Sequence, residues 1–355
     1  MQTMEEKLCI QATEKKIPVS GAFELSPLCN MSCDMCYARM ERGEVKQAGE
    51  LLEGDVWIDW ARQMREAGMM FLLLTGGEPL LYPDFQKVYR EVCEMGMYVT
   101  LNTNGTMIER EMAEFLGKYR PRRVNISLYG IDGKGYYDLC HYPEGFDRAI
   151  RGIRLLKERE IGVKINVSLT PKNQKYFSSF YRIGEMLQVP VEVDTYMFPF
   201  SRQNQVYPQQ SRLPSNQCAR AYLAALQTEK PKALDQLGKI CCDYKEGITL
   251  KNHQGVTCRA GRSSFWVNWQ GEMSPCFAMK KGGISLRKNS FKEAWKALNQ
   301  YVENVRVSSK CANCTRQEIC LACPGRAEAE TGDADGCPGY LCEFTEELLD
   351  CFTME

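Results

Sequence analysis

The chain has 355 residues, and 45 Lys and Arg balance 45 Asp and Glu, so the formal net charge is zero. This balance argues against binding of nucleic acid through a global basic field. No apolar run approaches the roughly 20 residues of a transmembrane helix, which excludes such a helix. Residues 1–18 form an N-terminal segment without an apolar signal-peptide core, so we expect a cytoplasmic protein that binds neither nucleic acid nor a membrane.

Strand-like and helix-like segments alternate from residue 19 to residue 197. Runs rich in Val, Ile, Leu, Phe and Thr predict strands over residues 22–25, 71–75, 98–102, 123–128, 163–169 and 191–196. Amphipathic patterns predict helices over residues 55–67, 84–95, 109–119, 147–160 and 175–187. This alternation predicts a parallel sheet with right-handed crossovers. Six such units favour an α/β fold with an open, partial (β/α)6 TIM barrel over a closed eight-unit barrel.

The chain changes character after residue 197. Residues 198–237 begin with a polar, proline-punctuated stretch and continue into a predicted helix over 217–227, so we interpret them as a linker and bridging helix. Residues 238–355 hold eleven of the 18 cysteines, and they show short strands and little apolar periodicity. This composition predicts a small, cysteine-rich C-terminal domain organised around metal rather than around a large core.

The 18 cysteines are the unusual feature of the composition. A secreted disulfide scaffold would be short and would carry an export signal, whereas this chain is long and shows no such signal. In a reducing compartment, clustered thiols bind metal more often than they pair with each other. Only two histidines, His141 and His253, accompany them. The expected ligands are therefore mostly thiolates, which favours iron–sulfur clusters or four-thiolate zinc.

Cys29, Cys33 and Cys36 form a C-x3-C-x2-C pattern directly after the first predicted strand. Three thiolates on one loop can ligate three corners of a four-iron cubane. The fourth iron then stays open, as a catalytic metal requires. The alternative is a zinc knuckle that a distant fourth ligand completes.

Polar and glycine-rich segments follow the next three predicted strands. They contain, in chain order, Gly76, Gly77, Glu78, Pro79, Asn104 and Ser127. The glycines permit close approach of a ligand to the backbone, and the glutamate can accept from an ammonium group. Because the carboxyl ends of parallel strands meet at one edge of a sheet, we expect these residues to surround the three-cysteine loop.

With these residues the chain resembles the radical S-adenosylmethionine (radical SAM) enzymes. In that family a 4Fe–4S cluster cleaves S-adenosylmethionine reductively, and the resulting 5′-deoxyadenosyl radical abstracts a hydrogen atom from the substrate. The resemblance implies that the three cysteines hold the cluster and that the Gly-Gly-Glu-Pro segment contacts the methionine end. It implies that Met35 contacts the adenine through its backbone, next to the aromatic Tyr37. Ser127 and Asn104 would lie near the ribose and the carboxylate.

Asp194 and Tyr196 end the sixth predicted strand and so face the same edge of the sheet. This position makes Asp194 a candidate catalytic residue and Tyr196 a candidate for cofactor contact. The alternative is that both side chains only line the barrel.

A second cysteine array occupies the C-terminal third. Its members are Cys258, Cys276, Cys311, Cys314, Cys320, Cys323, Cys337 and Cys342, in the patterns C-x12-G-x4-C and C-x2-C-x5-C-x2-C. The C-x2-C pattern alone supports a pair of structural zinc sites equally well. The array resembles the SPASM extension of radical SAM enzymes, which implies two auxiliary 4Fe–4S clusters.

The same resemblance implies an interleaved set of ligands. The inner cluster would be held by Cys258, Cys276 and Cys323. The outer cluster would be held by Cys311, Cys314, Cys320 and Cys342. The fourth ligand of the inner cluster stays open between Cys337, Cys241, Cys242 and the substrate.

We therefore interpret the chain as a radical SAM/SPASM maturase of the oxidoreductase type, with three 4Fe–4S clusters and S-adenosylmethionine. The leading hypothesis for its substrate is a ribosomally synthesised peptide or small protein that receives a thioether or carbon–carbon crosslink or is epimerised. A flavodoxin or ferredoxin would supply electrons. Because some 18 residues precede the barrel, too few for a peptide-recognition domain, either a separate protein or the barrel itself would bind a leader peptide. The alternatives are a sulfatase-type maturase, which Phe277 disfavours, a tetrapyrrole- or cofactor-modifying enzyme, and a zinc-binding interaction protein.

Overall fold

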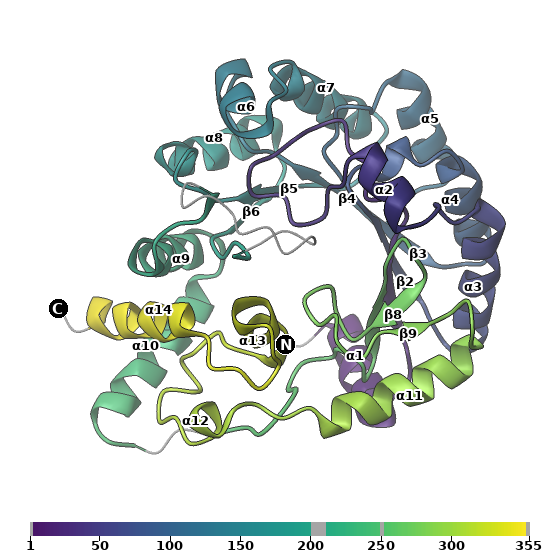
Figure 1. Cartoon of the computed structure of the whole chain (residues 1–355). Coiled ribbons are helices and arrows are strands. Elements are labelled where there is room, and N and C mark those ends of the chain that lie inside the picture. The colour runs from purple at the N-terminus through teal and green to yellow at the C-terminus, as the bar shows by residue number, and fades with distance from the viewer. Residues whose placement is uncertain (1–2, 200–210, 249–251, 353–355) are drawn as a thin grey trace.

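The computed structural model describes residues 3–199, 211–248 and 252–352, and in these ranges it shows one mixed sheet of nine strands. The strands are β1 (Ser20–Glu24), β2 (Phe71–Thr75), β3 (Tyr98–Thr103), β4 (Arg123–Ser127), β5 (Val163–Ser168), β6 (Val191–Asp194), β7 (Ser264–Val267), β8 (Glu272–Ser274) and β9 (Ile284–Ser285). Their spatial order is β6-β5-β4-β3-β2-β1-β7-β8-β9. Strands β1 to β6 are parallel and the sheet does not close, which confirms the partial barrel (Figure 1).

Helices follow most of the strands and cover the outer face of the sheet (Figure 1). They are α1 (Met4–Lys15), α2 (Arg42–Ala48), α3 (Gly54–Glu66), α4 (Phe85–Glu94), α5 (Arg110–Lys118), α6 (Gly133–Cys140), α7 (Gly145–Lys157), α8 (Phe177–Leu187), α9 (Ser215–Glu229), α10 (Pro231–Lys245), α11 (Phe291–Asn304), α12 (Ser309–Ala312), α13 (Pro324–Thr331) and α14 (Gly339–Cys351). Short 3-10 helices η1 (Pro79–Leu81) and η2 (Gln174–Tyr176) follow β2 and β5. The expected strands and barrel helices are confirmed to within three residues at each end. Part of the expected linker, residues 200–210, lies outside the described residues.

The hydrophobic core follows from the apolar strands. The helices bury the apolar side chains on the outer face of the sheet, and Val124 and Ile126 of β4 are fully buried. The C-terminal third adds to the same core, because α11 contributes Phe291 and Leu298 and α14 contributes Phe344. The expectation of little apolar periodicity and no large core in this third is therefore wrong. The apolar residues of α11 and α14 recur at helical spacing and pack on the barrel.

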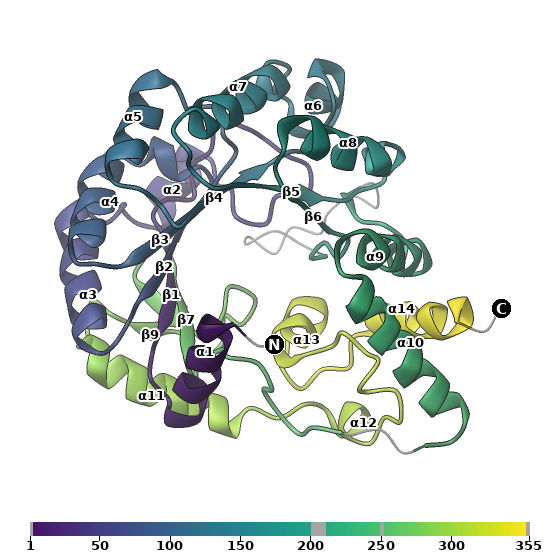
Figure 2. The same ribbon diagram turned by 180° about the vertical axis from the view of Figure 1, so that it is seen from behind.

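The C-terminal third joins the barrel through the sheet itself. Strand β7 pairs in parallel with β1, and β8 and β9 continue the sheet in antiparallel pairs. Gly271 lies in the turn between β7 and β8 with a φ of +86°, and a Cβ there would lie 2.6 Å from the Trp60 ring. The glycine of the C-x12-G-x4-C pattern is thus required by the fold. On the back of the molecule α1 and α11 lie side by side, and the Trp295 indole donates to the Lys16 carbonyl at 2.8 Å (Figure 2).

The opposite edge of the sheet, at β6, is covered by α9. The Glu229 carboxylate of α9 accepts from the Val193 N–H at 2.8 Å and from the Tyr181 hydroxyl at 2.6 Å. Helix α14 packs along α9, with the rings of Tyr222 and Phe344 5.7 Å apart. These helices and α13 lie across the gap between β6 and β7 (Figure 1).

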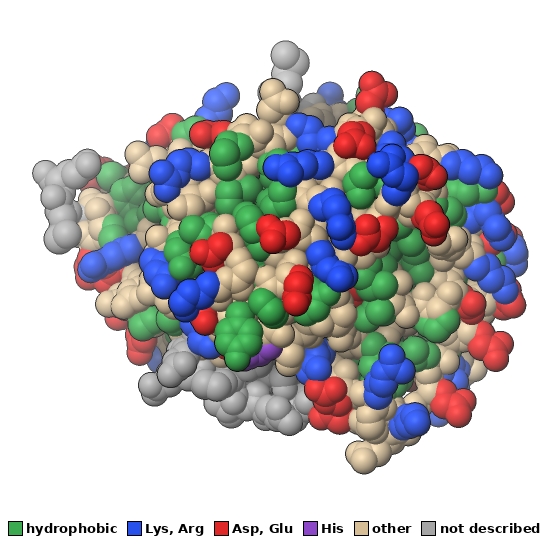
Figure 3. Space-filling view, turned by 90° about the horizontal axis from the view of Figure 1, so that it is seen from above, with side chains coloured by type: hydrophobic (Ala, Val, Ile, Leu, Met, Phe, Trp, Pro, Cys, Tyr) green, Lys and Arg blue, Asp and Glu red, His purple; other side chains and the backbone are tan. Residues whose placement is uncertain are grey.

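In the part of the chain that the structure describes, no helix is long and apolar enough to span a membrane. Acidic and basic side chains are interspersed over the face of the molecule seen in Figure 3.

Candidate active site

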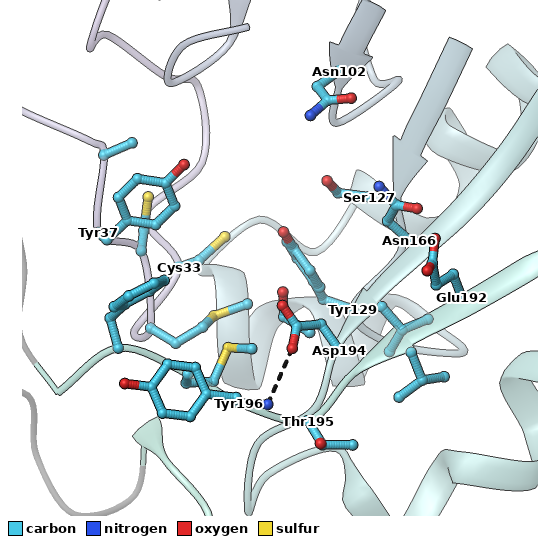
Figure 4. A pocket seen from close by; sticks show the side chains of 18 of the residues that line it. Cys33, Tyr37, Asn102, Ser127, Tyr129, Asn166, Glu192, Asp194, Thr195 and Tyr196 are labelled. Carbon is cyan, nitrogen blue, oxygen red and sulfur yellow. Dashed lines mark hydrogen bonds between the residues drawn. The ribbon is translucent and has the colours of Figure 1, made fainter. Parts of the chain in front are cut away.

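A cavity of about 590 Å³ lies at the carboxyl ends of the parallel strands, the edge at which open α/β sheets bind ligands. Its wall combines the loop after β1 and the ends of β2 to β6 with Phe277, Leu321 and Arg326 from the C-terminal third. In Figure 4, Cys33 lies on one side, and Asp194 at the end of β6 points into the space near it. The cavity therefore joins the two cysteine-rich parts of the chain.

The three-cysteine loop is held in place by α6. The Asp34 N–H donates to the Leu139 carbonyl at 3.0 Å. The Asp34 carboxylate accepts from Lys172 Nζ at 2.5 Å and lies 2.8 Å from His141 Nε2. This network fixes a loop that has neither helix nor strand structure of its own.

The thiols of this loop all line the cavity. Burial raises the pKa of Cys29, and the charges of Glu78 and of the other two thiols raise it further. The N–H groups of Met31 and Arg39 donate to the sulfurs of Cys29 and Cys36, each at 3.4 Å. A metal cluster relieves the repulsion between such thiols because it binds them as thiolates, and the N–H donors stabilise the negative sulfurs. The donor set therefore fits an iron–sulfur cluster.

Gly76 and Gly77 bring the end of β2 onto the start of the cysteine loop. A Cβ at Gly76 would lie 2.3 Å from the Ser26 carbonyl oxygen, and one at Gly77 would lie 2.5 Å from that of Leu28. The Gly77 N–H donates to the Ser26 carbonyl at 2.8 Å. Both glycines also line the cavity, where their missing side chains expose the backbone to a ligand.

Glu78 is buried and is absent from the cavity wall. Its carboxylate accepts from the Thr103 hydroxyl at 2.8 Å, the Asn104 N–H at 2.8 Å and the Leu80 N–H at 3.0 Å. Burial raises the pKa of Glu78 to about 7, although these hydrogen bonds lower it. Glu78 thus fastens β2 to β3, and its expected contact with an ammonium group stays a prediction. Pro79 begins η1 and is also absent from the wall.

Asn104 and Ser127 line the cavity, as the strand ends predict. The Asn104 amide donates to Asn30 Oδ1 at 2.8 Å and lies 3.7 Å from Cys29 Sγ, so it supports the cysteine loop. Asn166 on β5 also lines the cavity and was not predicted from the sequence. Its Oδ1 is buried without a hydrogen-bond partner among the described residues. Its polar side chain within an apolar strand was the available signal.

An aromatic cluster connects the cysteine loop with the C-terminal third. The Tyr37 ring lies 5.2 Å from that of Phe277 and 6.0 Å from that of Phe198, and Phe198 and Phe277 are 5.1 Å apart. Met35 is buried beside them on the wall. Both predicted adenine neighbours thus lie on the cavity, and Phe277, adjacent to Cys276, completes that side.

Asp194 and Tyr196 lie on the wall at the end of β6. Asp194 Oδ1 accepts from the Tyr196 N–H at 3.1 Å (Figure 4). Asp194 is exposed to the cavity, and partial desolvation by the surrounding protein raises its pKa, while the Tyr196 N–H and the Arg326 charge lower it. The Tyr196 hydroxyl donates to Glu330 at 2.6 Å. Asp194 therefore faces the cavity with an elevated proton affinity, and Tyr196 is fixed by α13.

Two arginines flank Tyr196, and they differ in whether a carboxylate pairs with them. Arg212 binds the Glu330 carboxylate through two nitrogens at 2.9 and 3.2 Å and stacks on Tyr340. Arg326 lies 4.7 Å from the centre of the Tyr196 ring and donates to the Leu321 carbonyl at 2.8 Å. Within the described ranges no carboxylate forms a salt bridge with Arg326. Its cation is thus available on the cavity wall.

Three cysteines of the C-terminal third form an inner set next to the cavity. Burial raises the pKa of Cys276 to about 11, and the charges of Cys323 and Cys258 add to that rise. Cys323 is the N-cap residue of α13, and its sulfur accepts from the Arg326 N–H at 3.5 Å. The neighbours Phe277 and Arg326 connect this set to the wall.

The other cysteines of the array form an outer set. Its members are Cys311, Cys314, Cys320, Cys337 and Cys342. The sulfurs of Cys337 and Cys342 lie 3.8 Å apart, and the Cys337 thiol is also hydrogen-bonded to Cys311. The structure therefore places Cys337 with the outer set and not with the inner one. Cys241 lies on α10, where its charged neighbours are Lys245 and Cys242.

Among the described residues, no three His, Cys, Asp or Glu side chains are arranged to hold a single metal ion. In a cubane each thiolate binds a different iron, so the sulfurs of one set need not converge on one point. The three sets are compatible with clusters of this kind.

An open parallel barrel with a thiol loop at its mouth and two further thiol sets behind the cavity defines an enzyme that works through iron–sulfur clusters. Residues 23–182 match the family model of the radical SAM superfamily, and residues 258–324 match that of the SPASM iron–sulfur cluster-binding domain. The chain belongs to the radical SAM superfamily and carries a SPASM domain.

Curated relatives resemble the chain over most of its length. An AdoMet-dependent heme synthase of Methanosarcina barkeri is 25% identical over 88% of this chain and 93% of its own. A PqqA peptide cyclase of Bradyrhizobium diazoefficiens is 23% identical over 93% of this chain and 88% of its own. The Streptococcus suis SuiB structure with its precursor peptide SuiA superposes with a TM-score of 0.70 at 17% identity, covering 95% of this chain and 80% of that one. These similarities support the fold and the superfamily, and they include relatives with different substrates.

Proposed function

We propose that this enzyme modifies a peptide or small protein, by forming a thioether or carbon–carbon crosslink or by epimerisation. The observation that carries the proposal is the single cavity whose wall includes the three-cysteine loop and residues next to the inner cysteine set. A peptide side chain in this cavity would lie between a radical source and an electron acceptor. Relatives named for peptide substrates, such as the PqqA peptide cyclase, support this reading.

We assign the first cluster to Cys29, Cys33 and Cys36, and the auxiliary clusters to the inner and outer sets. When bound, the first cluster and S-adenosylmethionine supply a 5′-deoxyadenosyl radical that takes a hydrogen atom from the substrate. The residues proposed to hold S-adenosylmethionine are Met35, Tyr37, Gly76, Gly77, Asn104, Ser127, Asn166 and Tyr196. The buried Oδ1 of Asn166, which has no partner in the described ranges, suits a ribose hydroxyl donor.

A crosslink removes two hydrogen atoms from the peptide. One leaves with the deoxyadenosyl group, and the other leaves as a proton and an electron. Asp194 points into the cavity and partial desolvation there raises its pKa, so it can accept that proton. The electron would pass to the inner cluster, behind Phe277. In turnover, a flavodoxin or ferredoxin would reduce the first cluster.

Arg326 is the proposed anchor for a substrate carboxylate. It lies on the wall without a carboxylate partner among the described residues, while the neighbouring Arg212 is already paired with Glu330. A guanidinium binds a carboxylate through two parallel hydrogen bonds. We therefore expect the modified segment to carry Asp, Glu or a terminal carboxylate near the reacting side chain.

The test is an anaerobic assay of the reconstituted enzyme with dithionite and S-adenosylmethionine. Short peptides encoded beside its gene serve as substrates, and mass spectrometry follows peptides and 5′-deoxyadenosine. We expect a peptide that loses two hydrogens, or keeps its mass but changes one stereocentre, with Cys33→Ala as the inactive control. Formation of 5′-deoxyadenosine with every such peptide unchanged would refute the peptide assignment.

A second candidate is modification of a tetrapyrrole. It is favoured by the heme synthase relative and by Arg326, because a propionate is also a carboxylate. The same assay with Fe-coproporphyrin III distinguishes the two, since decarboxylation would release carbon dioxide from a propionate. For either substrate we expect Arg326→Gln to raise KM about tenfold or more, Arg326→Lys to recover part of the loss, and Arg220→Gln on α9 to have no effect.

A further inference from the structure

The outer cysteine set contains one thiol more than a cluster can use. A 4Fe–4S cluster takes four thiolates, and the set has five members. Cys311, Cys314 and Cys320 lie within residues 258–324, which match the SPASM family model, whereas Cys337 and Cys342 lie beyond that match. The family match therefore does not say which of these two completes the site.

Cys342 is presented by a rigid element. It lies in the first turn of α14, and its N–H donates to the Pro338 carbonyl at 3.2 Å. Helix α14 is tied to α9, for example by the Ser215 hydroxyl of α9, which donates to the Glu343 carboxylate of α14 at 2.7 Å. The Cys342 sulfur lies 3.8 Å from that of Cys337, and the Cys320 sulfur lies 4.0 Å from the carbonyl oxygen of Leu341, which precedes Cys342, so Cys342 lies beside other members of the set.

Cys337 reaches the same place from a loop. It lies between α13 and α14 without regular structure. Its sulfur is 3.8 Å from that of Cys342, and it is hydrogen-bonded to Cys311 as well. Both thiols are partly buried, and both have Cys311 as a neighbour. If Cys337 replaces Cys342 as a ligand, only the short loop between α13 and α14 has to shift, and the packing of α14 stays intact.

We propose that Cys337 and Cys342 are interchangeable fourth ligands of the outer cluster. One of the two cysteines binds the iron as a thiolate while the other lies beside it as a thiol. When they exchange, a proton moves from the incoming thiol to the outgoing thiolate. No electron is gained or lost in this exchange. The device keeps the cluster fully ligated when either sulfur is lost to oxidation.

Single and double variants of the full chain test the proposal after anaerobic reconstitution. We expect Cys337→Ser and Cys342→Ser each to retain about 12 iron atoms per chain, and the double variant to retain about 8. Cys320→Ser is the control for a ligand without a substitute and should lose about four iron atoms. Cys351→Ser, at the far end of α14, should lose none. Substrate-free formation of 5′-deoxyadenosine shows that the barrel of each variant is folded.

Iron loss in Cys337→Ser or in Cys342→Ser equal to that in Cys320→Ser would overturn the proposal, as would a double variant that keeps all its iron. Alkylation of the unmodified holoenzyme gives a readout that does not depend on folding of a variant. We expect two singly labelled populations, one at Cys337 and one at Cys342. Label on only one of these residues in every molecule would mean a fixed ligand and would also overturn the proposal.

Discussion

Gly77→Ala tests whether close packing of backbone on backbone positions the first cluster. The added Cβ would lie 2.5 Å from the Leu28 carbonyl oxygen and 2.6 Å from that of Pro27. Neither oxygen belongs to a flexible side chain, so the two segments must separate. Overpacking costs roughly 1–3 kcal/mol. Two backbone hydrogen bonds, from Gly77 to Ser26 and from Glu78 to Leu28, lie at this contact.

Loss of both bonds would add roughly 0.5–1.5 kcal/mol each, for a total of about 2–6 kcal/mol. Because the separating segment leads into Cys29, we expect Gly77→Ala to lose about four of about 12 iron atoms per chain and to lose 5′-deoxyadenosine formation. Gly43→Ala is the matched control. A Cβ there meets nothing within 4 Å, and it lies in α2, where alanine is favoured. A Gly77→Ala protein with full iron and parental cleavage of S-adenosylmethionine would refute this reasoning.

Further predictions concern buried groups near the cavity. The pKa of Glu78 is raised from about 4.5 in the unfolded chain to about 7 in the folded protein. Glu78 therefore contributes about 3 kcal/mol to the free energy of unfolding below pH 4.5, and this contribution is lost as the pH rises through 7. The free energy of unfolding of the cluster-free parent, measured with urea, should fall from about pH 5 to about pH 8 relative to that of Glu78→Gln. An equal pH dependence in the two proteins would contradict this. Glu330→Ala leaves Arg212 without its buried partner and should destabilise by about 3–5 kcal/mol, against less than about 1 kcal/mol for the exposed Asp333→Ala in thermal unfolding. Asn166→Ala should raise the apparent Kd for S-adenosylmethionine about tenfold with iron content unchanged; an unaltered Kd would remove Asn166 from the site.

Local pattern was enough to predict the barrel. Strand β2 carries the apolar run Phe71–Leu74, which is typical of a buried parallel sheet. The order of the six strands follows from short right-handed crossovers. The three-cysteine loop and Ser127 were placed correctly at the cavity, because parallel strands share one carboxyl edge.

The remaining features depend on contacts between distant segments. Sequence position puts Glu78 at the cavity, but three donors from β3 and η1 hold its side chain beneath the wall. Strand β7 has four residues and no strong local signal, and only its pairing with β1 makes it part of the barrel sheet. Arg326 lies in the first turn of α13, directly after the N-cap residue Cys323. No sequence pattern near β6 could indicate that this turn lies on the cavity wall.

The pairing of β7 with β1 also bears on how the molecule is assembled during synthesis. Glu24 of β1 and its hydrogen-bond partner Trp266 of β7 are 242 positions apart in the chain. At synthesis rates of roughly 5–20 residues per second, one edge of β1 stays without its neighbour for about ten seconds or more. A nascent chain of this kind has an open strand edge that can pair with other chains, and its inner and outer cysteine sets become complete only when the last third of the polypeptide has emerged.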